Sequence, residues 1–551
     1  MDTTSHDDIA MGNATRYHVK DAGESKEENK IETASIASHD FGSMTNISDN
    51  THRSLKPRHI QLLGIGGVIG TFLFVGIGKA LIAGGPGSLF LSFVFWCFVI
   101  LGVTECCSEM VTYLPISSPF IRFAGRFVDD AFGVATGWNF FIFQAILVPF
   151  EMVAVNIILN YWTDKIPVAA VVSIILVIYI VVNSFNVKYY GEIEFWLAIA
   201  KIFLIVGLTA YTFVTMVGGN PLHDKYGFRY WRDPGSFIEY YTTGNTGRFL
   251  GFVQCLISAS VTVTGPEYIS MTAGEAANPR DTMPKVFKSV FWRLACFFAL
   301  GSLCIGIVVP SNSEDLAAAY STSGSNAGAS PYVISMNRLQ IPILPHIVNG
   351  ALILSALSTG NSVFYCASRS LYGLALEGKA PKFFRKTTKA GIPIFCIAAV
   401  ILISLLAFLQ VSSGSAKVFG WLVNIITTSQ LINLAVICFT YLCFRKAWAV
   451  QKRPQTLLPY KARWQPYSTY FSLTCCLLMV FVSGYEVFLN DEWDTATFFF
   501  SYTMIGVFIV IFILAKIIKR SSFVRPADVD LVSDVQEIED YTANYIETPD
   551  R

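Results

Sequence analysis

The sequence contains the stretch Gly64-Ile65-Gly66-Gly67-Val68-Ile69-Gly70-Thr71-Phe72-Leu73-Phe74-Val75-Gly76, with five glycines in thirteen residues. It lies inside an apolar segment, at about 60–82, that is long enough to cross a bilayer. Each glycine in a helix interior costs roughly 0.5–1 kcal/mol relative to alanine, so an unbroken helix is disfavoured here. Because unpaired backbone groups are costly in lipid, irregular chain persists there only where it lines a protein-buried cavity. The stretch therefore predicts a membrane helix that is interrupted at a binding site.

The composition is that of a polytopic membrane protein. Of the 551 residues, 53% are hydrophobic and only 14% are charged, whereas a soluble domain has about 25% charged residues. The net charge of +1 gives no indication of a nucleic-acid partner. The sequence shows no Ser/His/Asp constellation and no spaced cysteine or histidine set for a metal, so neither an enzyme nor a metal site is expected.

About twelve apolar spans follow one another along the chain. We place them at about 60–82, 87–111, 131–159, 168–186, 194–217, 249–273, 287–309, 345–369, 391–410, 418–444, 467–488 and 495–518. Lys and Arg are concentrated in alternate loops, which predicts that both termini are cytoplasmic. Residues 1–56 are polar and almost without aromatics, which predicts a disordered cytoplasmic tail, and 521–551 form a second cytoplasmic tail.

A second interruption is expected in the sixth span, at Ser260-Val261-Thr262-Val263-Thr264-Gly265-Pro266-Glu267. The Gly-Pro step removes a backbone donor and disfavours helix at the preceding residue. Spans one and six would be the first members of two sets of five helices. Interrupted spans at matching places in two halves are typical of inverted-repeat transporters whose site lies near the bilayer midplane. The alternative is two ordinary kinked membrane helices, but the paired placement favours a transporter.

Several motifs resemble those of one protein family. They are Gly66-Gly67-Val68-Ile69-Gly70-Thr71, Ala273-Gly274-Glu275, Asn278-Pro279-Arg280 and Gly378-Lys379-Ala380-Pro381. Together they resemble the fungal amino acid permeases of the amino acid–polyamine–organocation superfamily, over nearly the whole chain outside the tails. The resemblance implies proton-coupled import at the plasma membrane, with the proton gradient as driving force and no cofactor. It also implies an all-α, LeuT-like five-plus-five core at 57–410 and 411–444, with two additional helices at 445–520.

A branch of that family shares further segments with this chain. The segments Tyr113–Arg126, Lys188–Glu192 and Tyr268–Met271 resemble the branch linked to the uptake of carnitine and polyamines. That branch is also described as a sensor that controls other transporters. The resemblance therefore leaves two functions open, an importer of amino acids or related amines and a transporter-like nutrient sensor.

The expected substrate site combines the two interruptions. In the family, a Gly-Thr-Gly type turn holds the substrate carboxylate, and Gly70, Thr71 and Phe72 match it except that phenylalanine replaces the last glycine. A cavity-facing ring at Phe72 would attract a quaternary ammonium by about 0.5–2 kcal/mol, whereas the alternative is that Phe72 packs against lipid or a neighbouring helix. The other candidate substrate-binding residues are Thr262, Val263, Thr264, Gly265 and Asn361.

Ionisable residues inside apolar spans are costly and by default functional. We select Glu151, Lys201 and Glu267 as candidates for proton coupling. The resemblance implies that Lys201 replaces the sodium ion of related transporters. Glu275 is nearer the cytoplasmic end, where gating or a structural ion pair is expected.

The expected partners are a small amino acid, quaternary amine or polyamine, the lipid bilayer, and ubiquitin ligases acting on the tails. Lys20, Lys26 and Lys30 are candidate ubiquitination sites. Such modification would direct the protein from the plasma membrane to endosomes and the vacuole.

Overall fold

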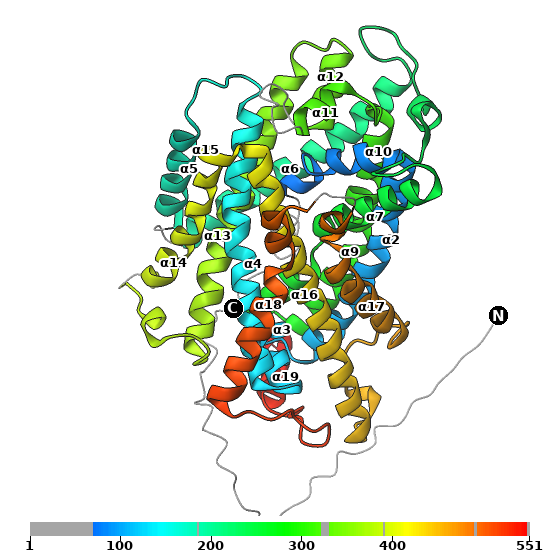
Figure 1. Ribbon diagram of the computed structural model, residues 1–551. Coiled ribbons are helices and arrows are strands. Elements are labelled where there is room, and N and C mark those ends of the chain that lie inside the picture. The colour runs from blue at the N-terminus through cyan, green and yellow to red at the C-terminus, as the bar shows by residue number, and fades with distance from the viewer. Residues whose placement is uncertain (1–69, 184–186, 321–329, 389–391, 490–492, 548–551) are drawn as a thin grey trace, which may run out of the picture. The chain divides into compact units, whose positions relative to one another are not determined.

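The computed structural model describes residues 70–183, 187–320, 330–388, 392–489 and 493–547 (Figure 1). Contacts divide the chain into residues 1–50 and 51–551, and all described residues belong to the second unit. The tail expected at 1–56, its three lysines and the first half of the glycine-rich stretch lie outside the described residues.

The regular secondary structure of the described residues is helical, as expected. The long or apolar helices are α2 (Ile77–Tyr113), α4 (Asp130–Leu159), α5 (Val168–Asn183), α6 (Val187–Met216), α7 (Gly244–Thr262), α9 (Pro279–Arg293), α10 (Leu300–Val308), α13 (Leu344–Leu376), α14 (Ile394–Ser404), α16 (Ser415–Val450), α17 (Tyr467–Val482) and α18 (Thr495–Lys519). Helix α2 joins the end of the first expected span to the second across a kink at Gly85. Each later expected span coincides with one or two of these helices. Within the described ranges, nine helical segments are long and apolar enough to cross a membrane, and two more apolar helices are shorter.

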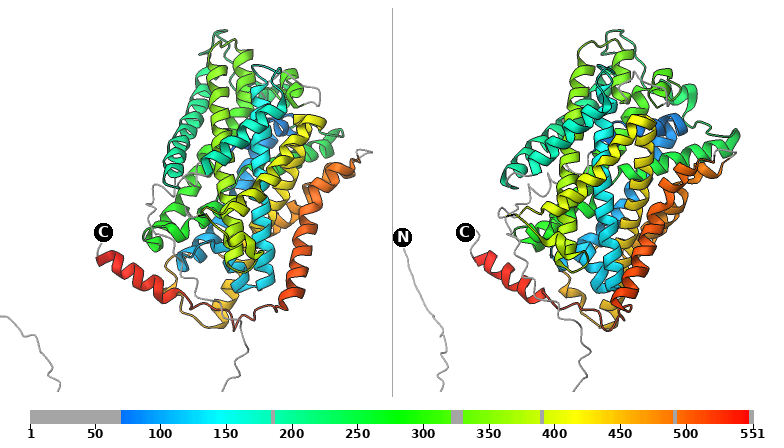
Figure 2. Two further views of the ribbon diagram at one scale, coloured as in Figure 1. Left: turned by 90° about the vertical axis from the view of Figure 1, so that its left-hand side faces the viewer. Right: turned by 60° about the vertical axis from the view of Figure 1, so that its left-hand side comes forward.

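Helix α4 is the centre of the packing. It contacts α13, α16 and α18, while α2 contacts α7, α10 and α17 (Figures 1 and 2). The side chain of Asp129 caps α4 by accepting a hydrogen bond from the backbone N–H of Ala131 at 2.9 Å, which satisfies one of the donors left free at a helix start. Helix α4 and its neighbour α13 carry part of the candidate site described below.

Outer helices expose apolar side chains. Phe203 on α6 is 70% exposed and Ile517 on α18 is 66% exposed. In water such faces would lose the roughly 25 cal/mol per Å² that burial of apolar surface provides, whereas in lipid they are solvated. These faces fit a bilayer, as the composition predicts.

The C-terminal segment packs on the helices, which the sequence did not predict. Val529, Leu531 and Ile538 are buried, and the Tyr113 hydroxyl donates to the carbonyl of Leu531 at 2.7 Å. Arg126, in α3 (Pro119–Phe127), donates to the carbonyls of Asp530 and Ser533 at 2.7 Å each and pairs with Asp534 at 2.8 Å. The last helix, α19 (Val535–Glu547), lies near α3 at one end of the bundle (Figures 1 and 2).

Candidate functional site

The first interruption is present at the predicted place. Gly70 is extended, Thr71–Leu73 form a single turn, and α2 begins only at Ile77. At the break, the Val75 carbonyl accepts hydrogen bonds from the Gly78 N–H at 3.4 Å and from the hydroxyl of Tyr320 in α11 (Glu314–Tyr320). The Thr71 hydroxyl donates to the carboxylate of Glu151 on α4. The described part of the stretch, residues 70–76, is therefore irregular chain held by polar contacts from two other elements.

The second interruption is also confirmed. Helix α7 ends at Thr262 and α8 (Pro266–Met271) begins after three residues. Gly265 has φ +149°, a conformation that residues with a Cβ rarely adopt, so glycine is required at this position. Pro266 begins α8, where a missing N–H costs nothing.

A cavity of about 40 Å³ lies between the two interruptions. Of the predicted substrate residues and carboxylates, Gly70, Phe72, Glu151, Thr262, Thr264 and Glu267 line it. Space of this size admits only a few waters. A substrate larger than a few waters would therefore fit in this space only if the surrounding elements move apart.

Four predicted substrate residues lie outside the cavity lining. Val263 is fully buried and Gly265 forms the turn before α8. Asn361 is on α13, where its side-chain oxygen accepts a hydrogen bond from Asn183 at 2.8 Å. Thr71 also does not line the cavity, but its contact with Glu151 connects it to the lining.

The predicted charged residues are buried around the cavity. Glu151 and Glu267 are each 1% exposed and Lys201 is 2% exposed. The Lys201 ammonium donates to Thr359 at 2.9 Å, and Thr359 lines the cavity. Burial of three ionisable groups so close together is favourable only when charges balance and hydrogen bonds are made.

Glu267 is only half satisfied. One of its oxygens accepts a hydrogen bond from Gln430 at 2.8 Å, and the other, Oε2, is buried and has no hydrogen-bond partner among the described residues.

Glu275 ends the short turn Ala273–Glu275, and its side chain lies outside what the structure describes.

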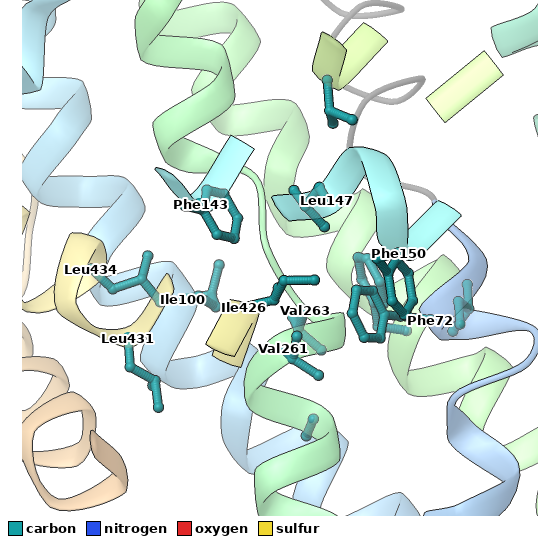
Figure 3. Close-up of a cluster of buried hydrophobic side chains, with 14 of the residues drawn as sticks. Phe72, Ile100, Phe143, Leu147, Phe150, Val261, Val263, Ile426, Leu431 and Leu434 are labelled. Atoms are coloured by element: carbon teal, nitrogen blue, oxygen red, sulfur yellow. The ribbon is translucent and has the colours of Figure 1, made fainter. Parts of the chain in front are cut away.

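Phe72 both lines the cavity and packs against a neighbouring helix. Its ring stacks on that of Phe150 with centroids 4.2 Å apart and planes 10° apart (Figure 3). Phe150 in turn contacts Phe419. The alternative of packing against a helix is thus correct for one face of the ring, while the lining position leaves part of the ring at the cavity.

The sequence did not reveal the whole lining. Phe143, Leu147, Tyr268 and Ile426 also line the cavity. In Figure 3, Ile426 lies between Val261 below and Phe143 and Leu147 above. These apolar residues look like any others in a membrane span, so no local signal separates them. Glu194, a buried carboxylate on α6, was the missed residue that the rule on ionisable residues could have found.

Comparison with known proteins decides the family. The family model described as amino acid permease matches residues 59–526. The chain belongs to the amino acid permease family. The general amino acid permease AGP2 of Saccharomyces cerevisiae is 47% identical over 500 residues, covering 89% of this permease and 84% of AGP2. The proline-specific permease of Emericella nidulans is 39% identical over 504 residues, covering 91% and 92%. The lysine-specific permease of S. cerevisiae is 36% identical over 490 residues, covering 88% and 79%. The relatives support amino acid transport by this permease, which is not an enzyme.

Solved structures confirm the fold. Variants of the Eremococcus coleocola manganese transporter match with TM-scores of 0.50 and 0.51 at 13% and 14% identity. Each match covers 84% of the permease and 94% or more of that chain. These are LeuT-fold transporters, so the permease is a polytopic membrane protein of that fold. In the part of the chain that the structure describes, no three His, Cys, Asp or Glu residues gather as a metal site would require.

Proposed function

We propose that this permease imports amino acids and related amines, including carnitine and polyamines, together with a proton by alternating access at the plasma membrane. The observation that carries the proposal is the buried Oε2 of Glu267, which has no hydrogen-bond partner among the described residues and belongs to a cavity-lining side chain. A buried acceptor left unpaired costs about 1–3 kcal/mol, and more when it is charged. An entering ammonium group or proton would remove that cost.

The charges around the cavity support coupling to a proton. Two carboxylates, Glu151 and Glu267, line the cavity, and the nearby buried cation is Lys201. With all three ionised, this trio carries one excess negative charge, which is unfavourable in a low-dielectric site. A zwitterionic amino acid brings no net charge, so a proton that binds with it would lower the excess negative charge of these groups, to which the buried Glu194 on α6 also contributes. A cationic substrate would lower that excess by its own charge.

Two features favour different amines. An unpaired carboxylate oxygen is best satisfied by an N–H donor, which amino acids and polyamines have and a trimethylammonium group lacks. The Phe72 ring would instead attract a trimethylammonium group such as that of carnitine. Competition among proline, lysine, spermidine and carnitine in uptake assays would separate these classes. Phe72→Leu is expected to weaken carnitine competition several-fold relative to proline competition.

Transport by purified protein in proteoliposomes tests the proposal. An inward proton gradient should drive concentrative uptake, and Glu267→Gln should reduce it at least tenfold because the charge that attracts the amine is lost. Glu486→Gln is a matched control, since Glu486 pairs with Lys79 at 3.7 Å and does not line the cavity. Lys201→Ala should also abolish uptake. Substrate binding without flux would replace the importer with a nutrient sensor, and unchanged uptake in Glu267→Gln would contradict the role of that residue.

We also propose that both termini are cytoplasmic and that ubiquitin ligases act on the tails. The distribution of Lys and Arg between alternate loops supports this orientation. Protease protection of tags placed at each end, in sealed cells and after permeabilisation, would test it.

A further inference from the structure

Glu194 is a buried carboxylate that lies outside the cavity. It is on α6, is 2% exposed, and accepts hydrogen bonds from the Ser358 hydroxyl at 3.2 and 3.1 Å. Among the described residues, the hydrogen bonds to the Glu194 carboxylate come from a neutral hydroxyl, so its negative charge is poorly compensated. Its surroundings must therefore supply positive charge for at least part of the time.

Lys201 is placed to supply that charge. It is seven residues after Glu194 on the same helix, which puts both on one face about 10.5 Å apart along the axis. Helical side chains lean toward the N-terminus, so the long Lys201 side chain leans toward Glu194. Thr359, which accepts the hydrogen bond from Lys201, is the next residue after Ser358 on α13. Two consecutive residues of α13 therefore hydrogen-bond to the two charged side chains of α6, Ser358 to Glu194 and Thr359 to Lys201.

Glu151 is the other carboxylate near Lys201, and it lines the cavity. Glu151 interacts electrostatically with Lys201, and so does Glu194. The Lys201 ammonium therefore has two carboxylates within the range of its charge, one that lines the cavity and one that does not.

We propose that Glu194 is the alternate counter-ion of Lys201 and positions its ammonium while Glu151 carries the transported proton. This inference rests on the proton-coupled transport proposed above. It adds Glu194 as the residue that pairs with Lys201 while Glu151 is protonated, so that Glu151 can bind its proton and release it again. When Glu151 accepts a proton from the aqueous side, its charge is neutralised, and Lys201 would be left buried without a counter-ion. Pairing with Glu194 removes that penalty, and Lys201 keeps its own proton throughout. When Glu151 releases the proton on the other side, Lys201 returns to it.

Other titratable groups near Glu151 do not replace this pair. Tyr179 on α5 is close enough to interact electrostatically, and Glu267 on α8 lies across the cavity. The first interruption and α13 present the hydroxyls of Thr71 and Thr359, which carry no charge. Tyr179 and Glu267 lie on other helices, whereas Glu194 is on α6 with Lys201, so neither of them takes the place of Glu194 as counter-ion.

The test measures the external pH at half-maximal uptake in proteoliposomes. Removing the charge with Glu194→Gln should make protonation of Glu151 harder and move this midpoint about one pH unit toward acid. Uptake at a pH above the midpoint would fall about tenfold and return on acidification. A merely structural role would lower uptake at every pH without moving the midpoint. Glu194→Asp, which keeps the charge, should stay within half a unit of the wild type.

Ser358→Ala gives a prediction of opposite sign and keeps every charge. Glu194 would lose its serine hydrogen bonds and depend more on Lys201, so Glu151 would protonate more easily and the midpoint would move toward higher pH. If Glu194→Gln does not elute as a folded, monodisperse protein, the pH midpoint of Ser358→Ala tests the inference instead.

Glu105→Gln is the matched control. Glu105 on α2 also accepts a serine hydrogen bond, from Ser468 at 3.1 Å, but it has no contact with Lys201 in the structure. The external pH at half-maximal uptake should be the same for Glu105→Gln as for the wild type. If the wild type shows no proton-driven uptake, the proposed function fails and this inference with it. If the wild type is proton-driven and neither Glu194→Gln nor Ser358→Ala moves the midpoint, only the alternate counter-ion is refuted.

Discussion

Replacing Gly70 by alanine would perturb the candidate site with a single methyl group. A Cβ at this position would lie 3.2 Å from Oε1 of Glu151 and 3.5 Å from Cγ2 of Thr359. The first contact is tighter than ordinary packing allows, so the carboxylate must move by a few tenths of an ångström. That movement would weaken the hydrogen bond that Thr71 donates to Glu151.

The magnitude follows from the type of hydrogen bond. A hydrogen bond to a charged group contributes about 1.5–3 kcal/mol, so its complete loss would change an equilibrium or rate by roughly 10–150-fold. Displacing the carboxylate by a few tenths of an ångström would remove part of this free energy. We therefore expect Gly70→Ala to reduce uptake efficiency about tenfold at normal surface abundance.

The assay is the initial rate of uptake of the best-transported amino acid, with Vmax and KM determined separately and surface protein measured by biotinylation. Gly420→Ala on α16 is the matched control, because an added Cβ there meets nothing within 4 Å, and it should transport as the wild type does. Wild-type uptake by Gly70→Ala at equal surface abundance would refute the reasoning that Gly70 is required for the close approach of Glu151.

Three further outcomes are expected. Gly360→Ala should sharply reduce the amount of folded protein, because its Cβ would lie 2.0 Å from the Tyr179 hydroxyl and such overpacking costs about 1–3 kcal/mol or more. Thermal stability by size exclusion after heating would show this, and Gly373→Ala on the same helix, with nothing within 4 Å, should not be destabilised. Arg126→Ala should raise hydrogen exchange in the C-terminal segment at neutral pH, since Arg126 makes three contacts with that segment at 2.7–2.8 Å. Burial raises the pKa of Asp530, but hydrogen bonds within the tail and the charge of Arg126 lower it more, so the net pKa lies below its usual range. The stabilisation from Asp530 is therefore present above about pH 4 and is lost as the pH falls through the lowered folded value, which hydrogen exchange between pH 7 and pH 3 would detect. Exchange of this segment that stays the same in Arg126→Ala and across that pH range would contradict its attachment through these contacts.

Local chemistry made the two interruptions predictable. Glycine clusters and the Gly265-Pro266 step act on the backbone at their own positions, so the places where the helices break could be read without knowing the packing. Buried charges were equally readable, because Glu151, Lys201 and Glu267 stand in apolar spans where an ionisable residue is conspicuous.

Spacing within a helix did not reveal which side chains meet. Asn361 is close in sequence to Thr359, yet Thr359 lines the cavity and Asn361 contacts Asn183. The direction that each residue faces depends on how α13 is rotated against α4 and α6, and that rotation is set by packing over its whole length.

The sequence by itself determined the all-helical membrane fold, the order of the spans, the two breaks and the identity of the buried charges. These follow from hydropathy, from backbone chemistry and from the cost of charge in lipid, all of which act locally. The tertiary structure alone decided that Thr71 reaches Glu151 across 80 residues, that Lys201 donates to Thr359 on another helix, and that the C-terminal segment packs on Tyr113 and Arg126. Those contacts join residues that are far apart in the chain, and the glycine-rich stretch becomes a site only where other helices bring Glu151, Glu267 and Phe150 to it.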